Sequence, residues 1–442
     1  MCGAREFLLA AMSAQPAGRT HRRVAAPTFN QKGRLMAKRD RRVLGQANTL
    51  AEPVLDYNRL RHERLAKTQA EMRARDIGAL LLTDIMNIRY TTGISVMPLW
   101  TATNLAHYTV VPAQGDPVIF EYTLSKFVVD AIWPGARPAR VWQARFADQM
   151  VDRLSDEWAA EIKDTLQGLG LARERLGVDC LDYYGFTALQ KQGLTLTDAD
   201  ESLQAARLIK TPDEIELMRQ SAAVAEVALY DLEHAIRPGI NERELLAVFW
   251  HRLLALGGEH CFTRLLATGY RTNPWFHEAS SKMVRPGDLV GIDTDMIGPE
   301  GYACDVSRTF LCGDEATPVQ KEAYQVAHDF IQGTIELLKP GLGYQDFVDH
   351  LPAFPEAYRA QQYSTVVHGI GTDDESPFIP FPAGAWRVMP EGEFRENMVV
   401  SVEFYAGQVG EQDGVKLEDE VWITSDGPVV ISLYPYDAKL LA

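Results

Sequence analysis

The stretch LVGIDTDMIGPEGYACDVSRT, residues 289–309, decides the fold of the second half of this chain. An apolar run ends at Asp293 and Asp295 follows two residues later, so a single strand would point both side chains to one face. The turn residues 298–301 predict a hairpin that returns the chain and brings Asp305 close to Asp293. Buried carboxylates that crowd together repel one another, which indicates a cation between them.

Three further side chains of the kind that bind metals follow downstream. His368 begins the turn HGIG after an apolar run, Glu403 lies in the strand-like MVVSVEF, and Glu418 lies in KLEDE. Residues 411–414 predict a hairpin turn, which would let Glu403 and Glu418 face each other across adjacent strands. Such a set of carboxylates with one imidazole suits two divalent ions of the Mn, Fe, Co or Zn kind.

Composition places the chain among globular proteins. Its 442 residues are enough for two domains, and the 46% hydrophobic and 24% charged fractions are ordinary. No apolar run approaches the roughly 18 residues of a membrane helix, so we expect no membrane association. The five cysteines, an odd number in a long chain, do not predict a disulfide framework and favour a cytoplasmic protein.

Charge divides the chain into a basic head and an acidic body. Residues 1–48 hold 10 Lys and Arg against 2 Asp and Glu, whereas the remainder holds 34 against 58. The acidic body argues against nucleic acid as the main partner. We interpret residues 1–48 as a disordered leader, followed by one domain over residues 49–205 and a second over residues 206–442.

Local patterns predict the main elements of both domains. We expect a helix over 55–76, strands over 79–84, 108–112 and 117–122, a loop holding Trp100, and helices over 212–236, 242–258 and 321–338. The residues Arg237-Pro238-Gly239 end the first long helix, and Asn241 caps the next.

The ligand order Asp, Asp, His, Glu, Glu resembles that of the pita-bread metalloenzymes, which include methionine aminopeptidase, prolidase and aminopeptidase P. The best matching segments are DVSRT (305–309), HGIG (368–371) and the linker RLIKTPDEIELMR (207–219). The resemblance implies an α+β pita-bread catalytic domain behind a smaller α/β creatinase-like domain. It also implies a homodimer and a dinuclear metal site, with Asp295 as an extra ligand or an outer-shell partner of the five others.

The residues after HGIG depart from the peptidase pattern. Thr372 and Asp374 stand where peptidases of this fold carry histidines, whereas His277 matches an upstream peptidase histidine. A carboxylate cannot donate a hydrogen bond to an oxyanion, but it can take a proton from carbon, so Asp374 favours elimination over hydrolysis. The neighbouring Glu375 would raise the pKa of Asp374 by repulsion if both were buried.

This departure is similar to that of the bacterial DddP-type dimethylsulfoniopropionate lyases. The segments MPLWTATN, RTNPWF, IDTD, QYSTVVHGIG and YPYD resemble theirs. The resemblance implies a substrate site of Trp100, Tyr363 and Asp374, to which we add Trp275 and His277. The aromatic rings would hold the sulfonium by cation–π attraction, and Asp374 would take the Cα proton.

Other functions stay open from the sequence. Ser376 and His277 stand where such lyases have Trp and Gln, which leaves room for another small zwitterionic substrate. The alternatives are an Xaa-Pro aminopeptidase or dipeptidase, a creatinase-type enzyme, and a metal-free pita-bread binding module. Metal content separates the last from the others.

Overall fold

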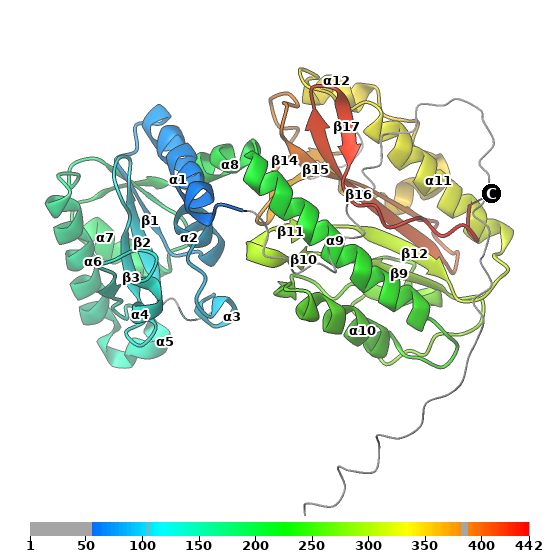
Figure 1. Cartoon of the computed structure of the whole chain (residues 1–442), viewed down its shortest axis with the longest axis horizontal. Helices are drawn as coiled ribbons and strands as arrows, with labels where there is room; N and C mark the ends of the chain where they lie inside the picture. Colours follow the sequence, from blue (N-terminus) through cyan, green and yellow to red (C-terminus); the bar gives the residue numbers. More distant parts are fainter. Residues whose placement is uncertain (1–54, 103, 105, 382–387, 442) are drawn as a thin grey trace, which may run out of the picture. The chain divides into compact units, whose positions relative to one another are not determined.

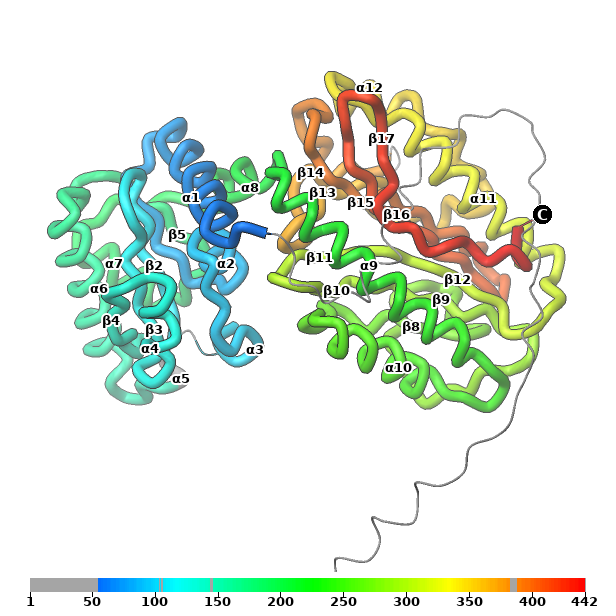
Figure 2. Tube along the Cα trace, viewed as in Figure 1, coloured from blue at the N-terminus to red at the C-terminus, as the bar shows by residue number. Residues whose placement is uncertain are grey.

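The computed structural model describes residues 55–102, 104, 106–381 and 388–441. The leader predicted over residues 1–48 lies outside the described residues. Figures 1 and 2 follow the described chain from an α/β part, blue to green, into a larger α+β part, green to red. Among the described helices, none is long and apolar enough to cross a membrane.

The N-terminal part is built on a six-stranded sheet with the order β4-β3-β2-β1-β5-β6. Its strands are β1 Ala79–Leu82, β2 Tyr108–Pro112, β3 Val118–Glu121, β4 Arg137–Pro138, β5 Arg175–Val178 and β6 Thr195–Asp198. Its helices are α1 Tyr57–Ala74, α2 Ile85–Thr92, α3 Pro98–Thr101, α4 Lys126–Val129, α5 Ala144–Ala147, η1 Asp148–Met150, α6 Val151–Gly168, α7 Tyr183–Lys191 and α8 Asp200–Leu208. The strand β1 pairs parallel with β5 and antiparallel with β2, as in a mixed α/β sheet.

Most elements predicted for this part are confirmed. The helix over 55–76 is α1, and the strands over 108–112 and 117–122 are the antiparallel pair β2 and β3. The predicted strand over 79–84 is shorter, because the Asp84 carboxylate accepts hydrogen bonds from two backbone N–H groups and so begins α2. The segment with Trp100 is not a loop throughout, since Pro98 begins the short helix α3.

The C-terminal part has helices on a set of antiparallel strands. Its helices are α9 Pro212–Ala235, α10 Glu242–Ala255, η2 Gly269–Arg271, η3 Pro299–Gly301, α11 Pro318–Ile335, α12 Tyr344–Asp349 and η4 Glu356–Gln361. Its strands are β7 His260–Cys261, β8 Leu266–Thr268, β9 Leu289–Asp293, β10 Met296–Ile297, β11 Ala303–Cys304, β12 Ser307–Leu311, β13 Thr365–Ile370, β14 Asp374–Pro380, β15 Val399–Gly407, β16 Gly414–Thr424 and β17 Gly427–Val430. They form sheets with the orders β14-β13-β15-β16-β17, β12-β9-β8 and β11-β10-β7.

Capping residues fix where the long helices begin. Thr211 and Glu214 form a capping box at the start of α9, with Pro212 in the first turn, and Asn241 and Glu244 do the same for α10. The predicted cap at Asn241 is therefore confirmed. The helix predicted from residue 321 begins earlier, at Pro318, because Thr317 is its N-cap.

Helices cover the central strands from different sides. The helix α11 packs on β15 and β16, where Phe330 contacts Phe404 with ring centroids 4.4 Å apart. The adjacent helices α9 and α10 share a separate core with β9 and β12 through side chains such as Ile292 and Phe310. Polar side chains on these strands are therefore enclosed by apolar packing, which makes their burial costly unless they are partnered.

The hairpin predicted before Asp305 is confirmed, with one correction. The strands β10 and β11 pair across η3, and Asp293 lies opposite Ser307 in the β9–β12 ladder. The prediction that Asp293 and Asp295 share one strand is wrong, because β9 ends at Asp293 and Asp295 has a left-handed φ of 36°. The chain turns after β9, and the direction of the Asp295 side chain is set by this turn and not by the alternation of side chains along a strand.

Candidate metal centre and adjoining cavity

The two glutamates of the predicted ligand set face each other across neighbouring strands. Glu403 on β15 lies directly opposite Glu418 on β16, as the hairpin over residues 411–414 predicts. His368 lies opposite Ser401 on the other side of β15. All three candidate ligands are buried, so the fold brings them together inside the protein rather than on its surface.

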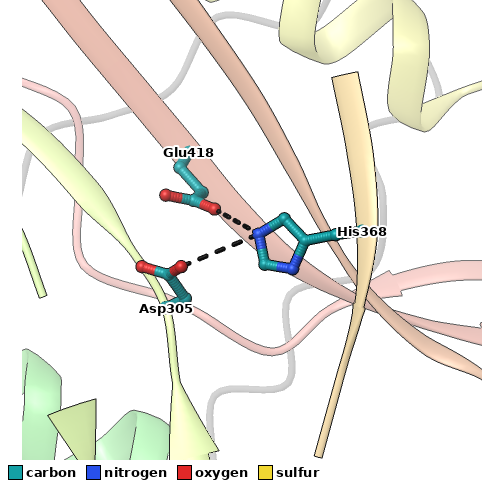
Figure 3. A group of neighbouring side chains, drawn as sticks. All are labelled: Asp305, His368 and Glu418. Carbon is teal, nitrogen blue, oxygen red and sulfur yellow. Dashed lines mark ion pairs between the residues drawn. The ribbon is translucent and has the colours of Figure 1, made fainter. Parts of the chain in front are cut away.

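The imidazole of His368 presents one nitrogen to the carboxylates. Its Nε2 lies 3.4 Å from Glu418 Oε1, 3.7 Å from Asp305 Oδ2 and 3.9 Å from Glu403 Oε1. Figure 3 shows Asp305, His368 and Glu418 pointing toward one another. The Nδ1 atom lies 3.0 Å from the carbonyl oxygen of Gly369, to which it can donate, and this leaves Nε2 free to bind a cation.

A second group of acids adjoins the first through Asp305. The carboxylates of Asp293, Asp295 and Asp305 have ligand atoms within 4.8 Å of one another. The Thr263 hydroxyl donates to Asp295, and burial raises the pKa of Asp295 to about 8. Burial also raises the pKa of Asp293 and that of Asp305. The structure thus places five of the six predicted ligands in two groups that share Asp305. The sixth, Glu403, lies beside the first group, with its Oε1 3.9 Å from His368 Nε2. The role of all six as metal ligands stays a prediction.

Lys416 lies inside this cluster, and the sequence reading missed it. Its side chain is fully buried, and its Nζ lies 2.9 Å from Glu403 Oε2, 3.1 Å from Glu418 Oε2 and 3.4 Å from Asp293 Oδ2. Burial alone would lower the pKa of Lys416, but these carboxylates raise it well above its usual value. The signal was present in KLE, because residues two apart on a strand share a face.

The donor set fits divalent metal ions. Glu418 Oε1 is buried and accepts no hydrogen bond from the described residues, although it faces the His368 imidazole. Burial raises the pKa of Glu403 to about 7, which marks a carboxylate that a cation would hold ionised. Carboxylate oxygens with one imidazole nitrogen match the preferences of Mn, Fe, Co or Zn.

A cavity of about 730 Å³ adjoins the cluster. Its lining residues are Thr263, Leu265, Pro274, Trp275, Phe276, Glu278, Asp293, Asp295, Asp305, Gln361, Gln362, Tyr363, Ser364, Thr365, His368, Asp374, Phe378, Glu403 and Tyr405. Asp374 Oδ1 lies 3.7 Å from His368 Nδ1, and its side chain is 46% exposed. A carboxylate beside the candidate ligands therefore faces open space that a substrate can enter.

The residues around Asp374 show what replaces the peptidase histidines. The backbone N–H and hydroxyl of Thr372 donate to Glu375 Oε1, while Lys210 Nζ lies 3.0 Å from Glu375 Oε2. Glu375 is buried but Asp374 is not, so these two neighbouring carboxyl groups lie in different environments and not together in one buried pocket. A Cβ at Gly371 would lie 2.5 Å from Glu375 Oε2, which explains the glycine at that point of the HGIG turn.

Two of the predicted aromatic contacts line the cavity. The ring of Tyr363 lies 4.8 Å from Lys416 Nζ and stacks on Phe276, with centroids 5.3 Å apart. Trp275 is only 5% exposed, and its ring packs so closely on Gly291 that a Cβ there would lie 2.9 Å from it. The next residue, Phe276, was not predicted as a substrate contact, yet its side chain is more exposed than that of Trp275.

Three other residues named from the sequence do not line the cavity. Trp100 lies on α3 against Tyr122, with ring centroids 5.5 Å apart. The Nδ1 of His277 lies within 3.0 Å of two backbone carbonyl oxygens, and the backbone N–H of Ser376 donates to Gln204. The role of Trp100 and His277 as substrate contacts stays a prediction.

Comparison with known proteins agrees with this architecture. Residues 64–209 match the Creatinase/Prolidase N-terminal domain, and residues 216–425 match Metallopeptidase family M24. Among solved structures, an Xaa-Pro dipeptidase from Bacillus anthracis covers 85% of this chain and 99% of its own at a TM-score of 0.68 and 21% identity. A prolidase from Pyrococcus horikoshii covers the same shares at a TM-score of 0.66 and 22% identity. These likenesses show the fold.

Relatives of described activity are also similar to this chain in sequence. The dimethylsulfoniopropionate lyase DddP of Roseovarius nubinhibens is 32% identical over 94% of this chain and 95% of its own. DddP of Roseobacter denitrificans is 32% identical over 87% of both chains. An Xaa-Pro dipeptidase of Pyrococcus horikoshii is 27% identical over 60% of this chain and 74% of its own. The chain therefore belongs to the M24 pita-bread superfamily, as a creatinase-type N-terminal domain followed by an M24 catalytic domain related to DddP lyases and Xaa-Pro peptidases.

Proposed function

We propose that this protein is a metal-dependent lyase that cleaves dimethylsulfoniopropionate, or a closely similar small zwitterion, to dimethyl sulfide and acrylate. The observation that carries the proposal is Asp374, a cavity carboxylate 3.7 Å from the candidate ligand His368, at a position where the peptidase pattern has a histidine. The 32% identity to DddP lyases over most of both chains supports the same reaction class.

In the proposed reaction, Asp374 takes a proton from the carbon next to the substrate carboxylate. The electron pair of that C–H bond forms the new carbon–carbon double bond, and the bond from Cβ to sulfur breaks. Dimethyl sulfide leaves with the pair of the broken bond as a neutral molecule, so no acid is needed to protonate it. Acrylate is the second product, and the proton stays on Asp374 until solvent takes it.

The chain's own residues would hold two divalent ions of the Fe, Mn, Co or Zn kind. The ligands would be Asp293, Asp295, Asp305, His368, Glu403 and Glu418. Bound ions would supply Lewis acidity that binds the substrate carboxylate and acidifies the adjacent C–H group. Lys416 Nζ binds the Oε2 atoms of Glu403 and Glu418. This contact leaves the Oε1 atom of each carboxylate directed toward His368 Nε2.

Headspace gas chromatography of metal-replete protein with dimethylsulfoniopropionate tests the proposal directly. We expect release of dimethyl sulfide and an equal amount of acrylate. A parallel digest of an Xaa-Pro dipeptide should release no amino acid. Amino acid without dimethyl sulfide would overturn the lyase proposal in favour of a peptidase.

A second candidate, an Xaa-Pro dipeptidase or aminopeptidase, is favoured by one observation. The cavity of about 730 Å³ is as large as the pockets of much bigger ligands than dimethylsulfoniopropionate. Hydrolysis would, however, have to proceed with Thr372 and Asp374 in place of histidines, and Thr372 is committed to Glu375.

We also propose that the protein is a cytoplasmic homodimer. A group of large apolar side chains is exposed around α3 and α4, which is unusual for a surface that faces only water. Its members are Met97, Leu99, Trp100, Leu124, Phe127 and Val128. Light scattering coupled to size-exclusion chromatography should give twice the 49.4 kDa chain mass, and a monomer mass would contradict the dimer.

A further inference from the structure

Phe276 has a backbone conformation that bulky residues rarely adopt. Its φ of 70° lies in the left-handed region, where the side chain of an L-residue crowds its own backbone. Such strain persists only where the surrounding structure enforces it, and it concentrates at binding and active sites. The position therefore calls for a functional reason.

The conformation separates two adjacent aromatic residues. Trp275 is buried beneath the cavity wall against Gly291 and lies near Tyr405, with ring centroids 6.3 Å apart. Phe276 is 65% exposed although it lines the same cavity. A regular strand would also alternate the two side chains, but the left-handed residue lets the Phe276 ring lie flat on Tyr363, at an interplanar angle of 15°.

Contacts connect Phe276 to the candidate metal centre through one intermediate ring. Phe276 stacks on Tyr363, and Tyr363 in turn contacts the Lys416 ammonium, which binds Glu403. The Tyr363 ring thus already has a cationic neighbour. One face of the Phe276 ring is stacked on Tyr363, but the side chain is 65% exposed, so part of the ring is accessible to an incoming cation.

The charge of the cavity favours the same kind of ligand. Among the described residues, its lining includes neither lysine nor arginine. It does include six carboxylates, those of Glu278, Asp293, Asp295, Asp305, Asp374 and Glu403. Most of these belong to the candidate metal centre, which bound ions would neutralise, and Arg264 forms an ion pair with Glu278. Asp374 is therefore the lining carboxylate that lies outside both the metal centre and that ion pair, on the open side of the cavity. An aromatic face beside anionic groups is the arrangement that attracts onium cations.

We propose that Phe276 is a specificity-determining residue, whose ring binds the onium end of a zwitterionic ligand while the ligand's carboxylate lies at the metal centre. The inference deepens the proposed function, since it names the residue that reads the positive charge of that substrate class. It assigns to Phe276 the role that the sequence suggests for Trp275.

Binding of two ligands with the same shape tests the role of the charge. The probes are 3-(trimethylammonio)propionate and its uncharged-tail analogue 4,4-dimethylpentanoate, titrated calorimetrically into metal-replete protein. Wild type should bind the ammonium compound more tightly than the analogue. Phe276→Leu keeps apolar bulk but removes the π face, so it should reduce this preference roughly 2- to 30-fold. Phe276→Trp should restore the preference.

Controls separate recognition from packing. Phe262→Leu removes another exposed phenylalanine, one outside the cavity lining, and should leave both affinities unchanged. Equal weakening of both ligands in Phe276→Leu, no weakening of either, or no binding of either probe by wild type would overturn the proposal. Because these titrations measure binding and not turnover, their outcome is independent of the dimethyl sulfide assay. A preference for the onium ligand without release of dimethyl sulfide would contradict only the lyase proposal.

Discussion

Asp374 and Glu375 are neighbours on β14, yet their carboxylates lie in opposite environments. Asp374 is 46% exposed in the cavity beside His368, whereas Glu375 is buried against Lys210 of the segment between α8 and α9. Adjacent residues of a strand point to opposite faces, so fixing one side chain constrains the other. A buried ion pair behind the strand thus holds the cavity carboxylate in place.

Lys210→Met should destabilise the protein by about 3–5 kcal/mol, because it leaves the Glu375 carboxylate buried with only the more distant Arg207 as a cationic neighbour. Urea unfolding checks the loss. The double variant Lys210→Met with Glu375→Gln should recover part of it, since no uncompensated charge remains. A single variant within about 1 kcal/mol of wild type would contradict this account of the pair.

Asp374→Asn should reduce dimethyl sulfide release by about 10²- to 10⁴-fold while leaving bound metal unchanged, because the amide cannot accept the Cα proton and Asp374 is outside the carboxylate groups near His368 Nε2. Gas chromatography and elemental analysis measure the two quantities. The exposed Asp349→Asn is a matched control that should retain full activity. Full activity in Asp374→Asn would show that another group is the base.

Asp305→Ala should lose metal as well as activity, since Asp305 is the one residue common to both candidate ligand groups. Elemental analysis after dialysis against metal should show the loss of at least one ion per chain. Asp314→Ala, on the exposed turn that follows β12, is the control and should bind as much metal as wild type. Unchanged metal in Asp305→Ala would discredit the ligand set, and absence of metal from wild type would revive the binding-module alternative.

The sequence predicted those parts of the site that depend on local pattern. The pairing of Glu403 with Glu418 follows from a short turn between two apolar strands, and the hairpin before Asp305 follows from its glycines and proline. Strand periodicity failed at Asp295, because a left-handed residue after β9 redirects the chain. A left-handed φ at a residue other than glycine cannot be recognised from the pattern of apolar and polar residues in the sequence.

Apart from the ligand set that the family resemblance implies, contacts between distant segments could not be predicted from the sequence. Lys416 can be placed on the ligand face of β16 by alternation, but its approach to Asp293 depends on how β16 packs beside β9. The pairing of Lys210 with Glu375 joins segments 165 residues apart. Trp275 and Phe276 are adjacent aromatic residues, and the sequence does not indicate which of the two rings is buried. Only the fold decides this.

Glu226 on α9 should make stability depend on pH. Burial raises the pKa of its carboxyl to about 7, although the backbone N–H of Leu433 donates to it. An acid with a raised folded pKa favours the protonated folded state, so stability is full below the unfolded value of about 4.3 and falls as pH rises toward 7. This difference between the folded and unfolded pKa values corresponds to roughly 4 kcal/mol. Glu226→Gln keeps the shape and the acceptor for Leu433 but cannot ionise, so its urea-unfolding free energy should fall less than that of wild type between pH 5 and about 8. Parallel pH profiles for the two proteins would mean that Glu226 is ionised, and compensated, throughout this range.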